Sequence, residues 1–79
     1  MKIQVLVRLK PGVLDVQGKA VEKGLVDLGF GDVSNLRVGK LIEFEVNDSN
    51  AEQAQQRVKE MCDALLTNTV IENYEIKPL

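Results

Sequence analysis

The chain has 79 residues, is 44% hydrophobic and 28% charged, and carries a formal net charge of −2. This length predicts one domain, residues 1–79, whose core is so small that oligomerisation often accompanies it. The charge provides no long-range attraction to nucleic acid or anionic membranes. One cysteine and no histidine exclude an internal disulfide, and they leave neither a zinc ligand set nor a Cys–His nucleophile pair.

The first strand is predicted over residues 2–9. Apolar side chains alternate there with mostly polar ones, and Ile3, Val5, Val7 and Leu9 share one face. A period of two is typical of a half-buried strand. Because of this alternation, the N-terminal segment has no continuous apolar run such as a signal peptide contains. Because no stretch approaches the ~20 apolar residues of a membrane span, we expect a cytoplasmic protein without a membrane partner.

The stretch "LKPGVLDVQGKAV" places two glycines and a lysine where a phosphate-binding loop would lie. Such a loop needs four residues between its glycines and a Ser or Thr after the lysine. Here five residues separate Gly12 from Gly18, and Lys19 is followed by Ala20. Asp15 would also bring a negative charge into a loop built for an anion. The spacing therefore argues against a nucleotide site.

A turn and a helix start explain the same residues better. Pro11-Gly12 suits a type II turn, in which glycine takes positive φ, and Asp15 is a suitable N-cap. Residues 16–29 then follow a helical period, with Val21, Leu25 and Leu28 on one face. Gly29 followed by an apolar residue is typical of a helix C-terminus.

The segment "VSNLRVGKLIEFEV" permits two interpretations. Gly39-Lys40 suits a two-residue hairpin turn, but that hairpin would pair apolar with polar residues across its two strands. Read as one strand over residues 33–46, the segment puts Leu36, Val38, Ile42, Phe44 and Val46 on one face. We favour one long strand kinked near Gly39, because a glycine inside a strand pattern often marks such a break.

The second helix is predicted to begin at a capping box of Ser49 and Glu52. Its apolar stripe comprises Ala51, Ala54, Val58, Met61, Cys62 and Leu65. Cys62 therefore lies on the buried face. Without a histidine or a cation cluster to activate it, it is better interpreted as a small core residue than as a reactive thiol.

The last strand is predicted from Val70, and Pro78 can end it. The elements follow one another as β-α-β(β)-α-β. This order predicts an α+β fold of two helices packed on one antiparallel sheet, resembling a ferredoxin-like arrangement.

No constellation in the chain predicts catalysis or metal binding. Glu43 and Glu45 alternate with apolar residues on a strand, as on a solvated face, and no spacing ties a carboxylate pair to proton transfer. The cations that could meet at the sheet ends lack the interleaved aromatics of a nucleic-acid reader. The sequence therefore indicates a binding or assembly module that makes no contact with nucleic acid.

Three stretches, "LKPGVLDVQGKAV", "VSNLRVGK" and "EMCDALLTNTVIENYEI", together resemble the PurS family, the small subunit of the bacterial phosphoribosylformylglycinamidine synthase complex. The resemblance covers nearly the whole chain. Val16 and Thr69 depart from it, because proline is frequent in the family at both places. Both departures lie where a loop meets a regular element, so they concern local rigidity.

The resemblance implies a non-catalytic subunit that forms homodimers or tetramers. It would bring a glutaminase subunit and an ATP-dependent synthetase subunit together, so that ammonia passes between them in de novo purine biosynthesis. ATP, magnesium and glutamine would be used by those partner subunits, with no cofactor or metal bound by this chain. A surface for those partners is predicted at Lys10, Pro11, Gly12, Asp15, Lys19, Arg37 and Lys40.

An ACT-like domain that senses small molecules, with "KPGVLD" as its site, is the alternative. The two interpretations differ in whether the chain binds amino acids or protein subunits. In either, we expect an oligomer. A straight 14-residue strand would span about 46 Å at ~3.3 Å per residue, whereas a globule of this size is only about 30 Å across. Its seam with a second copy is predicted at Ile42, Phe44 and Val46.

Overall fold

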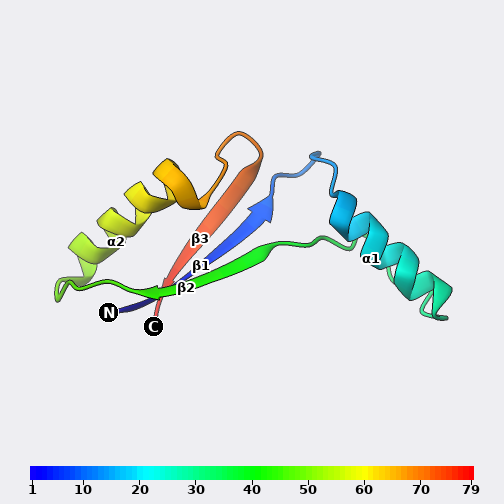
Figure 1. The fold of residues 1–79 in the computed structure, drawn as a ribbon, viewed down its shortest axis with the longest axis horizontal. Helices are drawn as coiled ribbons and strands as arrows, with labels where there is room; N and C mark the ends of the chain where they lie inside the picture. Colours follow the sequence, from blue (N-terminus) through cyan, green and yellow to red (C-terminus); the bar gives the residue numbers. More distant parts are fainter.

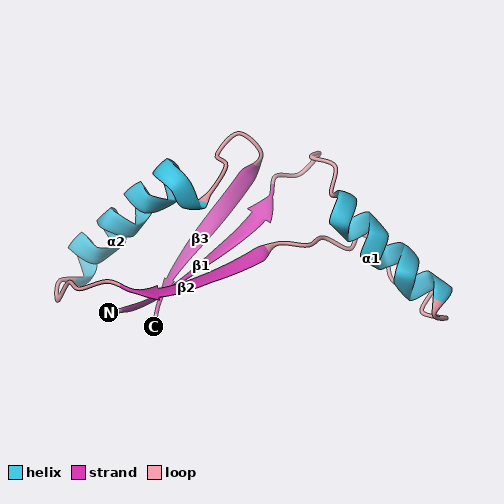
Figure 2. Cartoon of the chain, in the orientation of Figure 1, coloured by secondary structure: helices cyan, strands magenta, loops and turns pink.

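A computed structural model describes residues 1–79. The elements in chain order are β1 (Lys2–Leu9), α1 (Val16–Asp27), β2 (Lys40–Glu45), α2 (Ala51–Met61), the π-helical turn η1 (Cys62–Leu66) and β3 (Glu72–Pro78). The three strands form one antiparallel sheet in the order β2-β1-β3 (Figure 2). The predicted α+β class and the order of helices and strands are confirmed. Neither helix is long and apolar enough to cross a membrane.

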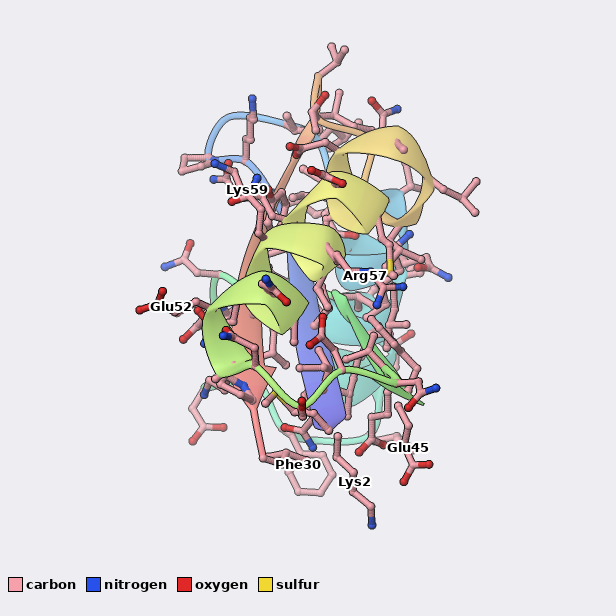
Figure 3. The ribbon with its side chains drawn as sticks, turned by 90° about the vertical axis from the view of Figure 1, so that its left-hand side faces the viewer. Lys2, Phe30, Glu45, Glu52, Arg57 and Lys59 are labelled. Atoms are coloured by element: carbon pink, nitrogen blue, oxygen red, sulfur yellow. The ribbon has the colours of Figure 1, made fainter.

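The core lies between the central strand β1 and helix α2. The face of β1 predicted to be apolar meets one side of the helix, which Figure 3 shows lying in front of the strand. The seven buried residues of this core are Ile3, Val5, Val7, Val46, Ala54, Val58 and Cys62. The opposite face of the sheet is mostly polar, with a hydrogen bond of 3.0 Å from Gln4 Nε2 to Glu43 Oε2. One helix therefore covers one face of the sheet.

The predicted stripe of α2 is confirmed at its centre and wrong at its ends. Ala54, Val58 and Cys62 are fully buried, whereas Leu65 is 84% exposed. The helix is capped by Asn50, whose side chain accepts a hydrogen bond of 3.1 Å from the Gln53 N–H, so no Ser49 capping box forms. Burial raises the pKa of the Cys62 thiol above its usual value. A buried, protonated thiol agrees with the prediction of a core residue.

Helix α1 projects away from the sheet instead of covering it (Figure 1). Its only buried residue is Gly18, and the predicted apolar face is largely open, with Leu28 75% exposed. The molecule extends over 49 × 24 × 14 Å and has a radius of gyration of 15.9 Å. A compact chain of this length would have a radius of about 12 Å. The periodicity of α1 therefore predicted a helix correctly, but within one chain this helix finds no sheet to cover.

The predicted long strand is shorter than expected, and no hairpin forms at Gly39. β2 begins at Lys40, opposite Val7 of β1, and the residues before it continue outward toward α1 without strand pairing. Two features prevent the strand from beginning before Lys40. The Val38 N–H donates to Asp15 Oδ2 instead of to a neighbouring strand. Asn35 has φ +56°, a left-handed conformation that interrupts a strand.

The absence of a side chain at Gly39 permits a close backbone approach. A Cβ atom at this position would collide with the carbonyl oxygen of Val7. We expect Gly39→Ala to lower the free energy of unfolding by about 1–3 kcal/mol, because the two backbones must move apart. Urea unfolding measures the change.

Gly31→Ala is the matched control, because a Cβ at Gly31 meets no atom within 4 Å. It should change the free energy of unfolding by less than about 0.5 kcal/mol. Equal stability of the two alanine variants would contradict the tight approach at Gly39.

Candidate interaction site at the junction of sheet and helix

The Asp15 carboxylate joins α1 to the extended segment before β2. The residue is only 5% exposed. Its Oδ1 accepts a hydrogen bond of 2.7 Å from the Gly18 N–H, so Asp15 is the N-cap of α1, as predicted. Its Oδ2 accepts from the Val38 N–H at 2.7 Å. The hydrogen bond from the Val38 N–H and, to a smaller extent, that from the Gly18 N–H lower the pKa of Asp15 below its usual 3.8.

The loop before Asp15 is held at both ends. The Val13 N–H donates to the Lys10 carbonyl at 3.1 Å, and Gly12 has φ +86°, so the predicted turn is confirmed. Lys10 is tied further by its own N–H, which donates to the Ile71 carbonyl at 2.8 Å. The Arg37 guanidinium donates to the Lys10 carbonyl at 3.3 Å. The loop therefore has one defined shape relative to the sheet.

The structure brings most of the predicted partner residues to this junction. Lys10, Asp15 and Arg37 are connected through the hydrogen bonds just described. Lys40 pairs with Glu72 at 3.8 Å beside them. A hollow of about 230 Å³ lies between the sheet end and α1 and is lined by Val7, Leu9, Asp15, Gln17, Val38, Gly39, Lys40 and Glu72. Pro11, Gly12 and Lys19 are exposed around it.

Two residues of the junction were missed by the sequence analysis. A Cβ at Gly18 would lie 2.6 Å from Asp15 Oδ2 and 2.8 Å from the Leu36 carbonyl oxygen. Glu22 Oε2 accepts from the Leu36 N–H at 3.3 Å. A signal existed for the first of them, because a glycine inside a helix pattern often marks a close approach. Nothing local marks Glu22, whose partner lies 14 residues away.

The geometry explains why this segment is no phosphate loop. The Gly18 N–H at the start of α1 is already taken by a carboxylate of the same chain. A phosphate at this helix terminus would need such free N–H groups and no adjacent negative charge. No group of three or more His, Cys, Asp or Glu side chains is arranged to hold a metal ion. The junction is therefore built for shape and hydrogen bonding.

A second, apolar surface lies between β2 and the end of α2. Phe44 of β2 and the end of α2 line a hollow of about 350 Å³, together with Met61, Ala64, Leu65 and Leu66. Of the predicted seam residues, Ile42 and Phe44 are half-buried at the margin of the core. Val46 is buried in the core of its own chain, so it is not available to a second copy.

The lowered pKa of Asp15 predicts a pH-dependent contribution to stability. We expect Asp15→Asn to lower the melting temperature at pH 7 by about 5 °C, as for the net loss of one hydrogen bond in a domain this small. Asparagine still caps the helix, but one of its two side-chain atoms is a donor and cannot accept from the Val38 N–H.

The pH dependence of this effect has a defined direction. A lowered pKa contributes stability above the unfolded-state value of about 3.9, and this contribution is lost as the pH falls through the folded-state value. The difference in melting temperature should be constant above pH 5 and shrink below pH 3.8. Asp32→Asn, at an exposed loop position, is the control. A difference that does not shrink between pH 5 and pH 2 would contradict the assignment.

Comparison with known proteins gives one consistent result. The model of the PurS family, described as phosphoribosylformylglycinamidine (FGAM) synthase, matches residues 2–78. The PurS subunit of phosphoribosylformylglycinamidine synthase from Synechocystis sp. is 48% identical over 71 residues, which are 90% of this chain and 71% of that protein.

Solved structures agree with this match. Bacillus subtilis PurS, at 42% identity, superimposes with a TM-score of 0.86 and covers 96% of this chain and 94% of its own. A chain in the structure of PurLQS from Thermotoga maritima, at 37% identity, gives a TM-score of 0.90 and covers 99% of this chain and 95% of its own. These matches do not favour the ACT-like alternative. The family resemblance of the three sequence stretches is thus confirmed, and the chain belongs to the PurS family, the subunit family of phosphoribosylformylglycinamidine synthase.

Proposed function

We propose that this chain is a non-catalytic assembly subunit of phosphoribosylformylglycinamidine synthase in de novo purine biosynthesis. In this role it brings the glutaminase and the ATP-dependent synthetase subunits together, so that ammonia passes from one to the other. Family membership over residues 2–78 carries the proposal. The solved complex of Thermotoga maritima named PurLQS supports it, because a chain of that complex shares this fold over 95% of its length. The cytoplasm is the location we expect for such a biosynthetic subunit.

The chemistry of the complex is assigned to the other subunits. Glutamine hydrolysis needs an activated nucleophile, whereas the only thiol of this chain is buried and its pKa is raised. ATP use needs a phosphate-binding site with magnesium, whereas Asp15 occupies the one helix start that resembled such a site. ATP, magnesium and glutamine would therefore act at partner subunits.

The junction of sheet and α1 is the surface proposed for those subunits. Its exposed cations and the Pro11-Gly12 turn stand on a backbone tied by hydrogen bonds. A preformed surface loses little conformational entropy when a partner binds. Arg37 and Lys40 provide donors there for carboxylates of a partner.

A homodimer is the second part of the proposal. Helix α1 exposes apolar residues that its own sheet does not cover, including Val21, Val26 and Leu28. The hollow beside Phe44 is lined by apolar residues alone. A second copy that lays its α1 into this hollow would bury both surfaces. Pairing of two such dimers would give a tetramer.

The assembly role is tested by reconstitution. The chain should elute together with the synthetase and glutaminase subunits of its own organism on a sizing column. It should also raise glutamine-dependent formation of the amidine at least tenfold over the two subunits alone. The isolated chain should hydrolyse neither glutamine nor ATP. Amidine formation at the full rate without the chain would overturn the proposal, as would turnover by the chain that a substitution within it abolishes.

The dimer is tested at Phe44. Phe44→Glu places a charge in the apolar hollow, so we expect it to dissociate or unfold the chain in sedimentation at micromolar concentration. Dilution of the wild type should lower its melting temperature, since folding and association are coupled by mass action.

Leu41→Glu is the matched control, because Leu41 lies on the same strand but on its uncovered face. This variant should remain associated. A folded wild-type monomer at micromolar concentration would exclude the dimer.

A further inference from the structure

Helix α1 contacts the rest of the molecule through its first two turns. Among its residues, Gly18 alone is buried, and Figure 1 shows the helix running away from the sheet beyond this point. No side chain of its second half packs on a strand, and Val26 and Leu28 remain exposed. The direction of α1 is therefore not set by hydrophobic packing within the chain. It must be set by the contacts of its first two turns.

Those contacts reach two residues of the segment before β2, Leu36 and Val38. Asp15 at the helix start accepts from the Val38 N–H at 2.7 Å. Glu22, one turn further along the helix than Gly18, accepts from the Leu36 N–H at 3.3 Å. Between them the helix backbone at Gly18 lies so close that a Cβ would be 2.8 Å from the Leu36 carbonyl. Two hydrogen bonds and one missing side chain thus fix the helix against residues 36–38.

Gly18 has no local reason to be a glycine. It lies in the first turn of α1, where glycine disfavours helix formation relative to alanine. No positive φ requires it, because the left-handed glycines of the chain are Gly12 and Gly29. The close approach to Asp15 and Leu36 is the remaining physical explanation. The chain therefore loses helix propensity at this position and gains a defined helix direction.

We infer that Asp15 and Gly18 are positioning residues that fix the direction in which α1 leaves the sheet, and that this direction determines whether the chain assembles. The second clause rests on the proposed assembly function. An exposed apolar helix meets a complementary surface only at the correct angle, and a change of direction at its start is amplified along its 12 residues. Neither residue needs to touch a partner for this effect.

Two alanine substitutions on the same helix separate direction from helix formation. Gly18→Ala introduces a Cβ against Asp15 and Leu36, whereas Gly24→Ala introduces one that meets nothing within 4 Å. Both favour the helix equally by propensity. We expect both variants to keep at least wild-type helix content by circular dichroism. Gly18→Ala should speed hydrogen exchange of the Val38 amide at least tenfold and weaken assembly with the synthetase and glutaminase subunits at least tenfold. Gly24→Ala should change both quantities less than twofold.

Asp15→Asn keeps the inference testable if Gly18→Ala does not fold. Asparagine retains a cap for α1 but loses the acceptor for Val38, so the same increase in exchange and the same loss of assembly are expected. Wild-type exchange at Val38 in both variants would overturn the positioning role. Faster exchange with wild-type assembly would overturn the link between direction and assembly. If the wild type itself fails to join the other subunits, the proposed function fails, while the exchange comparison still decides the positioning role.

Discussion

The core of this chain is large enough to hold one helix on its sheet, and the rest of the structure depends on that limit. Three strands present one apolar face, which is covered by Ala54 and Val58 of α2 and by Cys62 at the start of η1. In the absence of a second packing surface, α1 stands apart with its apolar residues exposed. A chain of 79 residues buries too little surface to be a robust domain alone. An unsatisfied helix in a small protein is best explained by a partner that completes the core.

The molecule has two surfaces of different character, the hollow beside Phe44 and the junction of sheet and α1. The hollow beside Phe44 is lined by apolar residues alone. The junction of sheet and α1 is polar, cationic and held by backbone hydrogen bonds. Apolar surfaces of the first kind are typical of permanent interfaces in general, and polar surfaces of the second kind are typical of contacts between different proteins. An assembly subunit needs both, because it must hold its own shape and also position others.

The chain illustrates how a helix start that resembles a catalytic element becomes structural. A free helix N-terminus attracts anions through its unpaired N–H groups. Here the carboxylate of Asp15 satisfies the Gly18 N–H from within the chain, and its other oxygen holds Val38. The same electrostatic preference that would bind a phosphate instead fixes the geometry of a joint. A subunit without a catalytic site can thus be highly specified at the residue level.

Features that depend on neighbours in the chain could be predicted from the amino-acid sequence. Alternation identified β1, a period of three to four identified α2 with Cys62 inside it, and turn chemistry identified the Pro11-Gly12 turn and the Asp15 cap. Three stretches were also sufficient to identify the family. Each of these signals lies within a few residues, where steric and hydrogen-bonding preferences act directly. Most of the fold and most of the junction residues followed from them.

The contacts between those features depend on the three-dimensional path of the chain. The period of α1 shows which side chains share a face, but not that its own sheet leaves this face uncovered. The pattern of residues 33–46 continues through Gly39, yet pairing begins at Lys40, because Asp15 takes the Val38 N–H from 23 residues away. Gly18 and Glu22 acquire their roles in the same way, through atoms of Leu36 that no local pattern specifies. Local sequence fixes the conformation of a segment, whereas its partners are set by the path of the whole chain.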